Sequence, residues 1–223
     1  MRNATICIAI LLLGLCLRVS GKEDLKDRTL NTAADVNYLS ELEKEVVYEI
    51  NLFRSNPSAY AEKYIAPLAK YYDKKILHYP GDKSIMTQEG VSALRECVRA
   101  LKNADPAPVL YPNKLLTQAA NDHQKDQAKT GKTGHIGKDR SNSKIRIERY
   151  GKWQVRIAEN IAYGNTSARQ IVIFLLIDDG VKNRGHRANL LQTDFKNVGV
   201  ACGTHPRYQT MCVMDFAGGM ENK

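Results

Sequence analysis

The sequence predicts an α+β domain, and three observations support this fold class. Apolar residues recur at the spacing of an amphipathic helix in several segments between residues 40 and 178. Two apolar segments near the end of the chain, 198–202 and 212–216, have the length and composition of paired strands. The sequence contains no internal repeat and no low-complexity tract. Helices and an antiparallel hairpin are therefore expected to share one core.

The first helix is predicted to begin after Ser40, because Glu43 follows three residues later and completes the pattern of a capping box. Its apolar positions continue at helical spacing until Pro57 interrupts them. A second, shorter helix is predicted over 58–68. The first part of the chain is therefore expected to be helical.

Two further helices are predicted over 88–103 and 115–130. The first of them places Cys97 on its apolar side, which favours a buried, inert thiol over a bridge to a second chain. The two segments are separated by a proline-containing linker.

Residues 155–163 are predicted to form a strand that carries Glu159. Ser167 and Gln170 then repeat the capping-box pattern and open a helix over 171–178. The hairpin described above completes the chain.

Three cysteines remain once an N-terminal leader is removed, namely Cys97, Cys202 and Cys212. In an oxidising compartment Cys202 and Cys212 are the natural pair, and their disulfide would join the two strands of the hairpin. Closing a loop of this length contributes about 2–3 kcal/mol to stability.

Residues 1–21 have the pattern of a secretory signal peptide, with a basic start at Arg2 and an uncharged apolar run over 6–17. The run is short for a membrane span, although an uncleaved anchor is the alternative interpretation. Residues 22–38 are polar and lack periodicity, so a loose mature N-terminus is expected. Residues 39–219 are then expected to form a single domain.

The chain is basic, and its charge limits the classes of partner that it is expected to bind. Removing residues 1–21, which contain two arginines and no acid, leaves 31 of the 33 basic residues against 24 acidic ones, so the net charge falls from +9 to +7. A secreted protein of this charge is attracted to anionic lipids, glycans or cell-wall polymers. The basic residues are scattered and no nucleic-acid motif is present, so no nucleic-acid partner is expected.

Three short segments in the second half of the chain combine residues suited to metal or proton chemistry. They contain His135 between two glycines, Glu159 beside an asparagine, and Asp178 with Asp179 shortly before His186. Imidazole and carboxylate groups can bind a divalent metal or share protons with one another. These segments are the clearest candidates for a functional site.

The order of these segments resembles the CAP superfamily of cysteine-rich secretory proteins, venom antigen 5 and plant pathogenesis-related proteins. The nearest likeness is to its SCP-like branch in bacteria and protists. The resemblance extends from about Leu39 to Gly219. The segments on which it depends are 46–52 with Arg54, Asn56 and Pro57; Gly134-His135; Glu159-Asn160-Ile161; Asp178-Asp179-Gly180; Arg184-Gly185-His186-Arg187-Ala188-Asn189; and Asp215-Phe216-Ala217-Gly218-Gly219.

The resemblance implies an α-β-α sandwich with a central antiparallel sheet and a cleft lined by two histidines and two acids. By position these are His135, Glu159, Asp178 and His186. The family often has glutamate at the third position, and because aspartate is one methylene shorter, Asp179 is an alternative to Asp178. Residues near 70–108 form an insertion relative to the compact animal members.

Two interpretations of the four residues stay open. Neutral imidazoles can ligate Zn²⁺ or another divalent metal while carboxylates ligate it or orient the rings, and three protein ligands would leave a position for water. Alternatively, the carboxylates hold the rings in a polar network that fixes the surrounding loops. Both interpretations need the same residues near one another.

Other candidates are weaker. His123 is expected to be a solvated or core-edge residue of its helix, although it could line the same cleft, and His205 is expected in a hairpin loop. Asn165 begins an N-glycosylation sequon. No Gly-x-Ser-x-Gly segment supports serine catalysis. The apolar helix face around Cys97 argues against thiol catalysis.

Two functions follow from the resemblance and the residues. The first is a secreted, monomeric binding module for a sterol or lipid, an anionic surface or a cell-surface receptor. The second is a metal-dependent hydrolase such as a peptidase, in which Zn²⁺ on His135 and His186 activates water, Glu159 is the general base and Asp178 is a ligand or orients a ring. The binding module is the preferred prediction, because the sequence contains no His-Glu-x-x-His helix and membership of a family does not guarantee catalysis.

Overall fold

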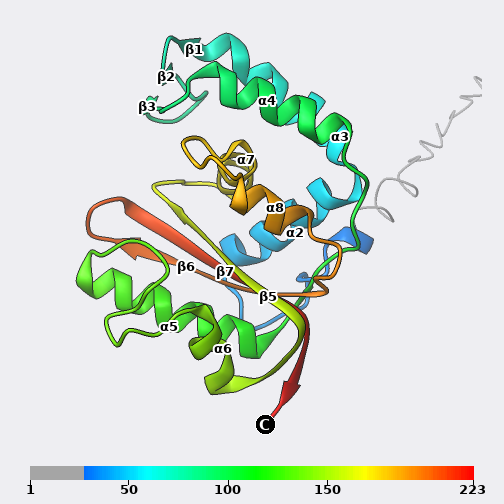
Figure 1. Ribbon diagram of the computed structural model, residues 1–223, viewed down its shortest axis with the longest axis vertical. Helices are drawn as coiled ribbons and strands as arrows, with labels where there is room; N and C mark the ends of the chain where they lie inside the picture. Colours follow the sequence, from blue (N-terminus) through cyan, green and yellow to red (C-terminus); the bar gives the residue numbers. More distant parts are fainter. Residues whose placement is uncertain (1–27) are drawn as a thin grey trace, which may run out of the picture.

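The computed structural model describes residues 28–223 (Figure 1). The predicted signal peptide, 1–21, and the first six residues of the predicted loose N-terminus lie outside the described residues. Over 28–223, none of the helices has both the length and the apolar character that crossing a membrane requires.

The centre of the domain is a four-stranded sheet in the order β4-β6-β7-β5. Strand β6 (Asn197–His205) and strand β7 (Gln209–Asn222) form the predicted hairpin, and β5 (Gly151–Tyr163) pairs with β7 on its other side. These pairings are antiparallel, as expected, whereas the two-residue strand β4 (Tyr111–Pro112) runs parallel to β6. Strand β5 is therefore an edge of the sheet.

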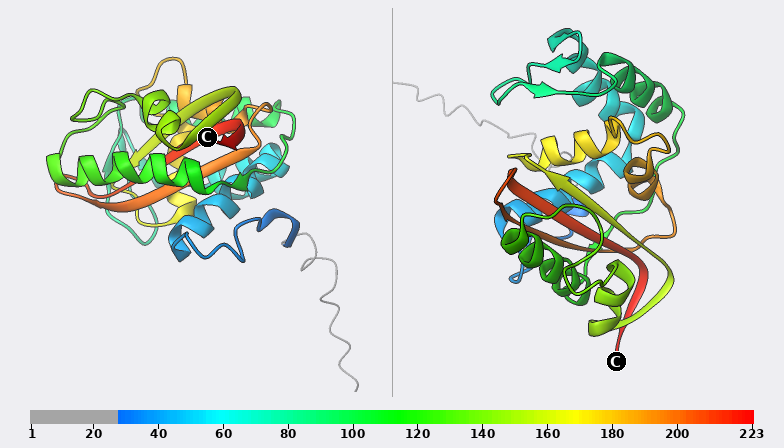
Figure 2. Two further views of the ribbon diagram at one scale, coloured as in Figure 1. Left: turned by 90° about the horizontal axis from the view of Figure 1, so that it is seen from below. Right: turned by 60° about the vertical axis from the view of Figure 1, so that its left-hand side comes forward.

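Helices cover both faces of this sheet, which confirms the sandwich (Figure 2). On one face lie α5 (Lys114–Thr130) and α6 (Ser143–Tyr150). On the other lie α2 (Glu41–Ser55), α7 (Ala168–Ile177) and α8 (Gly185–Leu191).

Alternation along β7 explains how both layers obtain a core. Cys212, Met214 and Phe216 belong to the cluster shared with α2 and α7, whereas Val213 and Ala217 face the α5 side. Helix α5 lies so close to β6 that a Cβ atom on Gly199 would come within 2.2 Å of backbone atoms of α5, so only glycine fits there.

The helix ends follow from local chemistry. The Ser40 Oγ accepts from the Glu43 N–H at 3.4 Å, and the Glu43 carboxylate accepts from the Ser40 N–H at 2.7 Å, which confirms the first capping box. The second box is incomplete, because Ser167 accepts from Gln170 N–H but the Gln170 side chain accepts from the Thr166 N–H. Helix α7 accordingly begins at Ala168, three residues before the predicted start.

Two other predictions need correction. Helix α6, which Asn142 caps at its N-terminus, forms in a segment where no helix was predicted. Residues 28–38 are packed on the domain, because Ala33 is fully buried and the Thr32 hydroxyl donates to the Leu110 carbonyl at 2.7 Å. A loose segment would make neither contact.

The helical region after Pro57 is longer and less regular than predicted. It consists of α3 (Pro57–Tyr60), a π-helical turn over Ala61–Ile65 and a 3-10 turn over Ala66–Tyr71. Within the predicted insertion near 70–108, a small sheet precedes α4 (Val91–Lys102). Its strands are β1 (Tyr72–Asp73), β2 (Ile76–Leu77) and β3 (Ile85–Met86). Helix α4 packs outside α7 and adds a further layer at that end of the domain (Figure 1).

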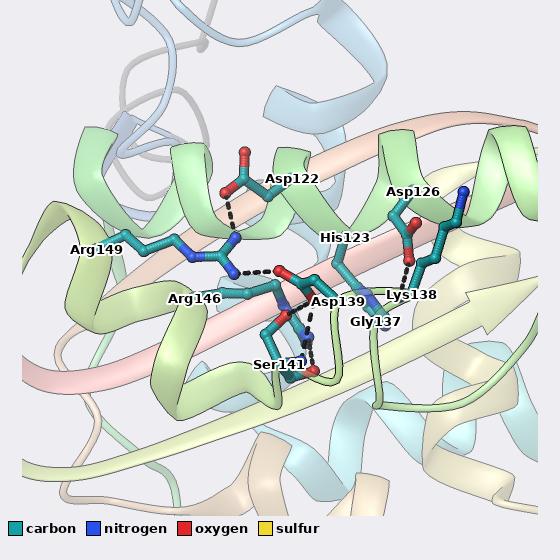
Figure 3. A pocket seen from close by; sticks show the side chains of 9 residues that line it. All are labelled: Asp122, His123, Asp126, Gly137, Lys138, Asp139, Ser141, Arg146 and Arg149. Atoms are coloured by element: carbon teal, nitrogen blue, oxygen red, sulfur yellow. Dashed lines mark hydrogen bonds and ion pairs between the residues drawn. The ribbon is translucent and has the colours of Figure 1, made fainter.

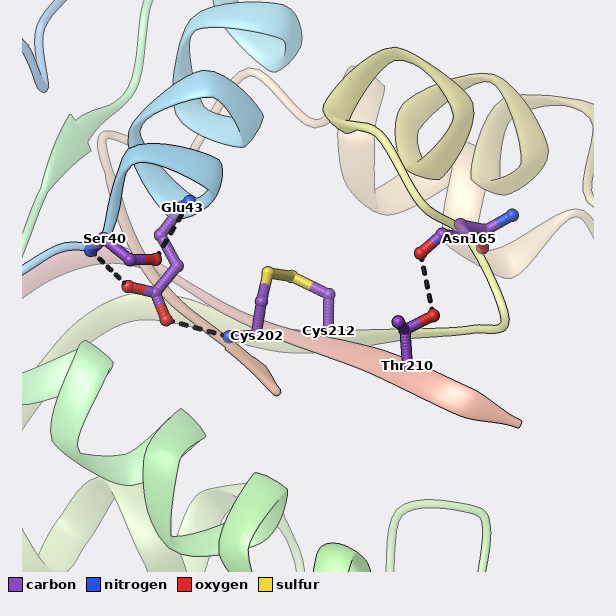
Figure 4. Close-up of a disulfide and its surroundings, with 6 residues drawn as sticks. All are labelled: Ser40, Glu43, Asn165, Cys202, Thr210 and Cys212. Carbon is purple, nitrogen blue, oxygen red and sulfur yellow. Dashed lines mark hydrogen bonds between the residues drawn. A yellow bond between two sulfur atoms is a disulfide. The ribbon is translucent and has the colours of Figure 1, made fainter. Parts of the chain in front are cut away.

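The predicted disulfide joins Cys202 to Cys212, which are directly opposed on β6 and β7 (Figure 4). Cys97 is the remaining cysteine of residues 28–223 and is buried in α4 without a disulfide. Burial raises the pKa of its thiol to about 12, so the reactive thiolate is strongly disfavoured at neutral pH. This agrees with an inert thiol.

Candidate functional site

His135 lies on the loop between α5 and α6 and faces β5. Its Nδ1 is 2.8 Å from the Glu159 Oε1. The second oxygen of Glu159 accepts from the Arg146 Nη2 at 2.6 Å, and both of these side chains are buried. Each oxygen of this carboxylate therefore already has a donor from the protein.

His186 is held by Asp178 in the same way from the other helical layer. The His186 Nδ1 lies 2.6 Å from the Asp178 Oδ1, and the His186 backbone N–H donates to the Oδ2 at 2.9 Å. Asp178 ends α7 in the left-handed conformation, with φ of 54°, which turns its carboxylate toward the first turn of α8. The shorter aspartate side chain thus reaches the ring, and both its oxygens bind the same residue.

Asp179 has a different role from the one considered as an alternative. Its two carboxylate oxygens accept from the backbone N–H groups of Gln88 and Glu89, at 2.5 and 2.8 Å. Asp179 thus attaches the loop after α7 to the segment before α4, whereas Asp178 contacts the His186 imidazole.

The structure brings the four predicted residues together at the free edge of the sheet. The ring centres of His135 and His186 are 6.5 Å apart and their planes are inclined by 32°. His135 comes from the layer of α5 and α6, and His186 from the layer of α7 and α8. The site is assembled where loops of the two layers meet beside β5.

The carboxylates also fix which ring nitrogen is available. Since each Nδ1 faces a carboxylate oxygen, it carries the proton in the neutral imidazole, and the Nε2 has the free lone pair. Neither Nε2 makes a hydrogen bond to any of residues 28–223, and the His135 and His186 side chains are 51% and 24% exposed. Both nitrogens are therefore accessible donor atoms for a ligand.

Two buried residues of this site were missed in the sequence. Arg146 donates to Glu159 and to the His135 carbonyl, but its helix was not predicted, so nothing distinguished it from a surface arginine. Asp215 lies opposite Glu159 on β7, is fully buried, and has no hydrogen-bond partner among residues 28–223. Burial and the nearby charge of Glu159 raise its pKa well above the usual range of a carboxyl group.

A cleft of about 630 Å³ adjoins His186. Part of its lining comes from the predicted insertion, including Ile85 and Met86, and another part includes Tyr163 of β5 and Phe174 of α7. The lining is largely apolar and aromatic and carries two basic residues, Lys83 and Arg207, and two acidic ones, Asp178 and Asp179; further lining residues include Ile161, Leu175, Val181 and Tyr208.

A second cavity, of about 400 Å³, lies behind the His135 loop between α5 and α6 (Figure 3). Charged residues dominate its wall, and several are paired with one another, as Arg149 is with both Asp122 and Asp139. His123 lines this cavity rather than the cleft beside His186. Burial lowers the pKa of His123, which keeps its ring neutral.

The other predicted positions lie outside the site. His205 was expected in a loop but ends β6, where it is buried and its Nε2 lies 3.1 Å from the Lys132 carbonyl oxygen. Asn165 follows β5, and its backbone carbonyl accepts from the Thr210 hydroxyl at 2.8 Å (Figure 4). Glycosylation of Asn165 stays a prediction.

Comparison with known proteins identifies the family of this chain. The model of the cysteine-rich secretory protein family, CAP, matches residues 47–216. An extracellular protein containing an SCP domain from Bacillus anthracis str. Ames is 22% identical with a TM-score of 0.42, over 56% of this chain and 37% of that one. An outer surface protein from Borrelia burgdorferi is 17% identical with a TM-score of 0.43, over 52% of this chain and 80% of that one. This chain thus spans little more than a third of the Bacillus protein, and no curated protein matches it.

The family match includes every residue of the site at the edge of the sheet. All four side chains fall within residues 47–216, which are most of the chain. The sandwich and the ordered motifs lead to the same assignment, and the chain belongs to the cysteine-rich secretory protein (CAP) family.

Proposed function

We propose that this CAP-domain chain is a secreted binding protein whose histidines, His135 and His186, hold a divalent cation at the mouth of the ligand cleft. The observation that supports this most directly is the shared orientation of the two rings. Each directs Nδ1 to a carboxylate and leaves Nε2 free, on opposite sides of one site. The signal-peptide pattern and the hairpin disulfide support secretion.

The donor set fits a cation of the Zn²⁺ type with two protein ligands. Metal-binding histidines commonly donate their other ring N–H to a carboxylate, which fixes the tautomer and raises the basicity of the ligand. Glu159 and Asp178 occupy that supporting position rather than a ligand position. No group of three or more potential ligands is arranged for a metal within residues 28–223, so the remaining coordination positions would belong to water or to the bound ligand.

The cleft wall indicates the class of ligand. Apolar and aromatic side chains share the wall with two basic residues, Lys83 and Arg207, and with two acids, Asp178 and Asp179. Both acids already accept hydrogen bonds from protein groups, whereas neither basic side chain forms an ion pair within residues 28–223. Such a wall favours an apolar molecule with an anionic or polar end, which agrees with the expected sterol or lipid. An anionic surface or a cell-surface receptor stays the alternative partner, supported by the net charge of the chain.

Hydrolysis by the same cation is less well supported. A bound cation would supply an activated water, but a general base would then be needed to accept a proton. Both oxygens of Glu159 already accept hydrogen bonds from His135 and Arg146. Both oxygens of Asp178 accept from His186. This arrangement favours binding over peptidase activity.

The test is a Zn²⁺ titration by calorimetry on the metal-stripped mature protein. We expect one-to-one binding that is lost in His135→Ala and in His186→Ala. His78→Ala is the matched control, because His78 is exposed in the segment before α4 and its side chain bonds only Ser84 among residues 28–223. Absence of binding by the wild type would remove the cation from the proposal.

Ligand binding and hydrolysis are tested separately. We expect the mature protein to bind at least one of cholesterol, oleate or anionic liposomes, and failure with all three would contradict the lipid assignment. Any proteolytic activity that persists in His186→Ala would not arise from this site.

A further inference from the structure

The residue before His135 is enclosed by a ring of three hydrogen bonds. The Gly134 N–H donates to the Tyr163 hydroxyl at 3.0 Å, and that hydroxyl donates to the Gln127 Oε1 at 2.7 Å. The Gln127 Nε2 then donates to the Gly134 carbonyl at 2.5 Å. The backbone N–H and the carbonyl of Gly134 are thereby both fixed by side chains from α5 and β5.

This ring fixes a backbone conformation that other residues rarely adopt. Gly134 has φ of 95°, in the region that glycine enters freely. His123 lies against the same carbonyl, with its Nε2 2.8 Å from the oxygen. Gln127 is almost completely buried, so its amide cannot exchange its partners for water without opening the layer between α5 and β5.

The position of the His135 ring depends strongly on this backbone. The His135 side chain is half exposed and its ring makes one hydrogen bond within residues 28–223, to Glu159. Besides the ring around Gly134, the loop is attached near this point by the Arg146 Nη1, which donates to the His135 carbonyl at 3.2 Å. Packing alone therefore does not lock the imidazole.

His186 has no such dependence. It lies in the first turn of α8, and Asp178 binds both its ring and its backbone N–H. The two histidines of the site are thus held by separate sets of hydrogen bonds, one from each helical layer.

We propose that Tyr163 and Gln127 are positioning residues for His135, which set the direction of its Nε2 by fixing the Gly134 peptide. The affinity consequence rests on the proposed cation site, whereas the geometric consequence does not. The Tyr163 hydroxyl must be neutral to donate and accept at once. Burial raises its pKa, which favours that neutral form.

Tyr163→Phe tests this proposal with little change of shape. It removes the hydroxyl but keeps the aromatic ring that packs against His205 and Tyr208, at centre distances of 5.5 and 5.3 Å. Tyr111→Phe is the control, because Tyr111 is exposed on β4, outside the cleft, and its hydroxyl bonds none of residues 28–223. Gln127→Glu is the second variant, since it keeps an acceptor for Tyr163 and removes the amide donor to Gly134.

The measurements are long-range ¹H–¹⁵N spectra of the histidine rings and the Zn²⁺ titration. In Tyr163→Phe and Gln127→Glu we expect the His135 ring nitrogens to shift toward the tautomer mixture of free imidazole, while the His186 nitrogens keep their wild-type shifts. Supporting groups of metal ligands typically change affinity 10–100-fold, so we expect Zn²⁺ binding about tenfold weaker in these variants and unchanged in Tyr111→Phe.

The outcomes separate this proposal from the cation site itself. If the wild type does not bind Zn²⁺, the cation site is wrong, and the ring spectra still decide whether Tyr163 and Gln127 position His135. Wild-type His135 shifts in both variants would overturn the positioning role. Equal changes in the His135 and His186 rings would also overturn it, because they would indicate general loosening of the domain.

Discussion

Replacement of Arg146 by methionine tests how the buried charges of the site contribute to stability. The guanidinium and the Glu159 carboxylate are 2.6 Å apart, and each side chain is only 2% exposed. Removing one partner of a buried ion pair leaves an uncompensated charge and costs about 3–5 kcal/mol. Arg146→Met should also release the Ser141 and His135 carbonyls, so the upper part of this range is expected.

The matched control is Arg149→Met on the same helix. Arg149 pairs with Asp122 and Asp139, but its side chain is 38% exposed and those of its partners are 33% and 54% exposed. Ion pairs between exposed side chains contribute little to stability, because solvent screens their charges. The two arginines therefore differ in expected effect several-fold.

The assay is urea unfolding followed by circular dichroism, with Arg146→Met, Glu159→Gln and the double variant. We expect the double variant to be more stable than the sum of the single losses predicts, because removing both partners leaves no buried charge unpaired. For a domain of this size each kcal/mol shifts the Tm by about 2–4 °C, so Arg146→Met should melt roughly 8–20 °C below the wild type. A loss below 1 kcal/mol, or equal losses in Arg146→Met and Arg149→Met, would refute the reasoning.

Three further predictions concern single groups. The raised pKa of Asp215 means that the native state holds its proton more tightly than the unfolded chain, so this group becomes unfavourable as pH rises above about 4. The free energy of unfolding of Asp215→Asn should accordingly increase relative to that of the wild type as the pH rises from 4 to 8. A difference between the two free energies that stays constant over this pH range, measured by urea denaturation, would contradict this. Replacing Cys202 and Cys212 together by serine should lower the free energy of unfolding by about 2–3 kcal/mol, measured by urea denaturation of the oxidised and variant proteins. Cys97 should resist alkylation by iodoacetamide in the native protein and react fully in urea, and rapid native labelling would show that the thiol is not buried.

Much of the fold was predictable because its signals are local. The Ser40 capping box, the apolar face around Cys97 and the hairpin of β6 and β7 depend on residues a few positions apart. Helix α6 was not predictable in this way. It is eight residues long, and the burial of Arg146 in it depends on Glu159 in the next strand.

The candidate site was predictable in its residues but not in its supports. Ordered motifs identified the two histidines and their acids, whereas the choice of Asp178 over Asp179 required the left-handed end of α7. Gln127 was indistinguishable from a surface glutamine, because its partners are a loop glycine and a tyrosine 36 residues away. Polar residues that are buried by distant contacts leave no periodic signal in the sequence.

The location of the site at the uncovered edge of β5 has a mechanical consequence. One histidine is attached to the layer of α5 and α6 and the other to the layer of α7 and α8, and 6.5 Å separates the centres of their rings. Any molecule gripped by both rings would act as a reversible cross-link between the halves of the sandwich. Its binding free energy would then add to the resistance of the layers to separation, in proportion to the logarithm of its concentration above the Kd.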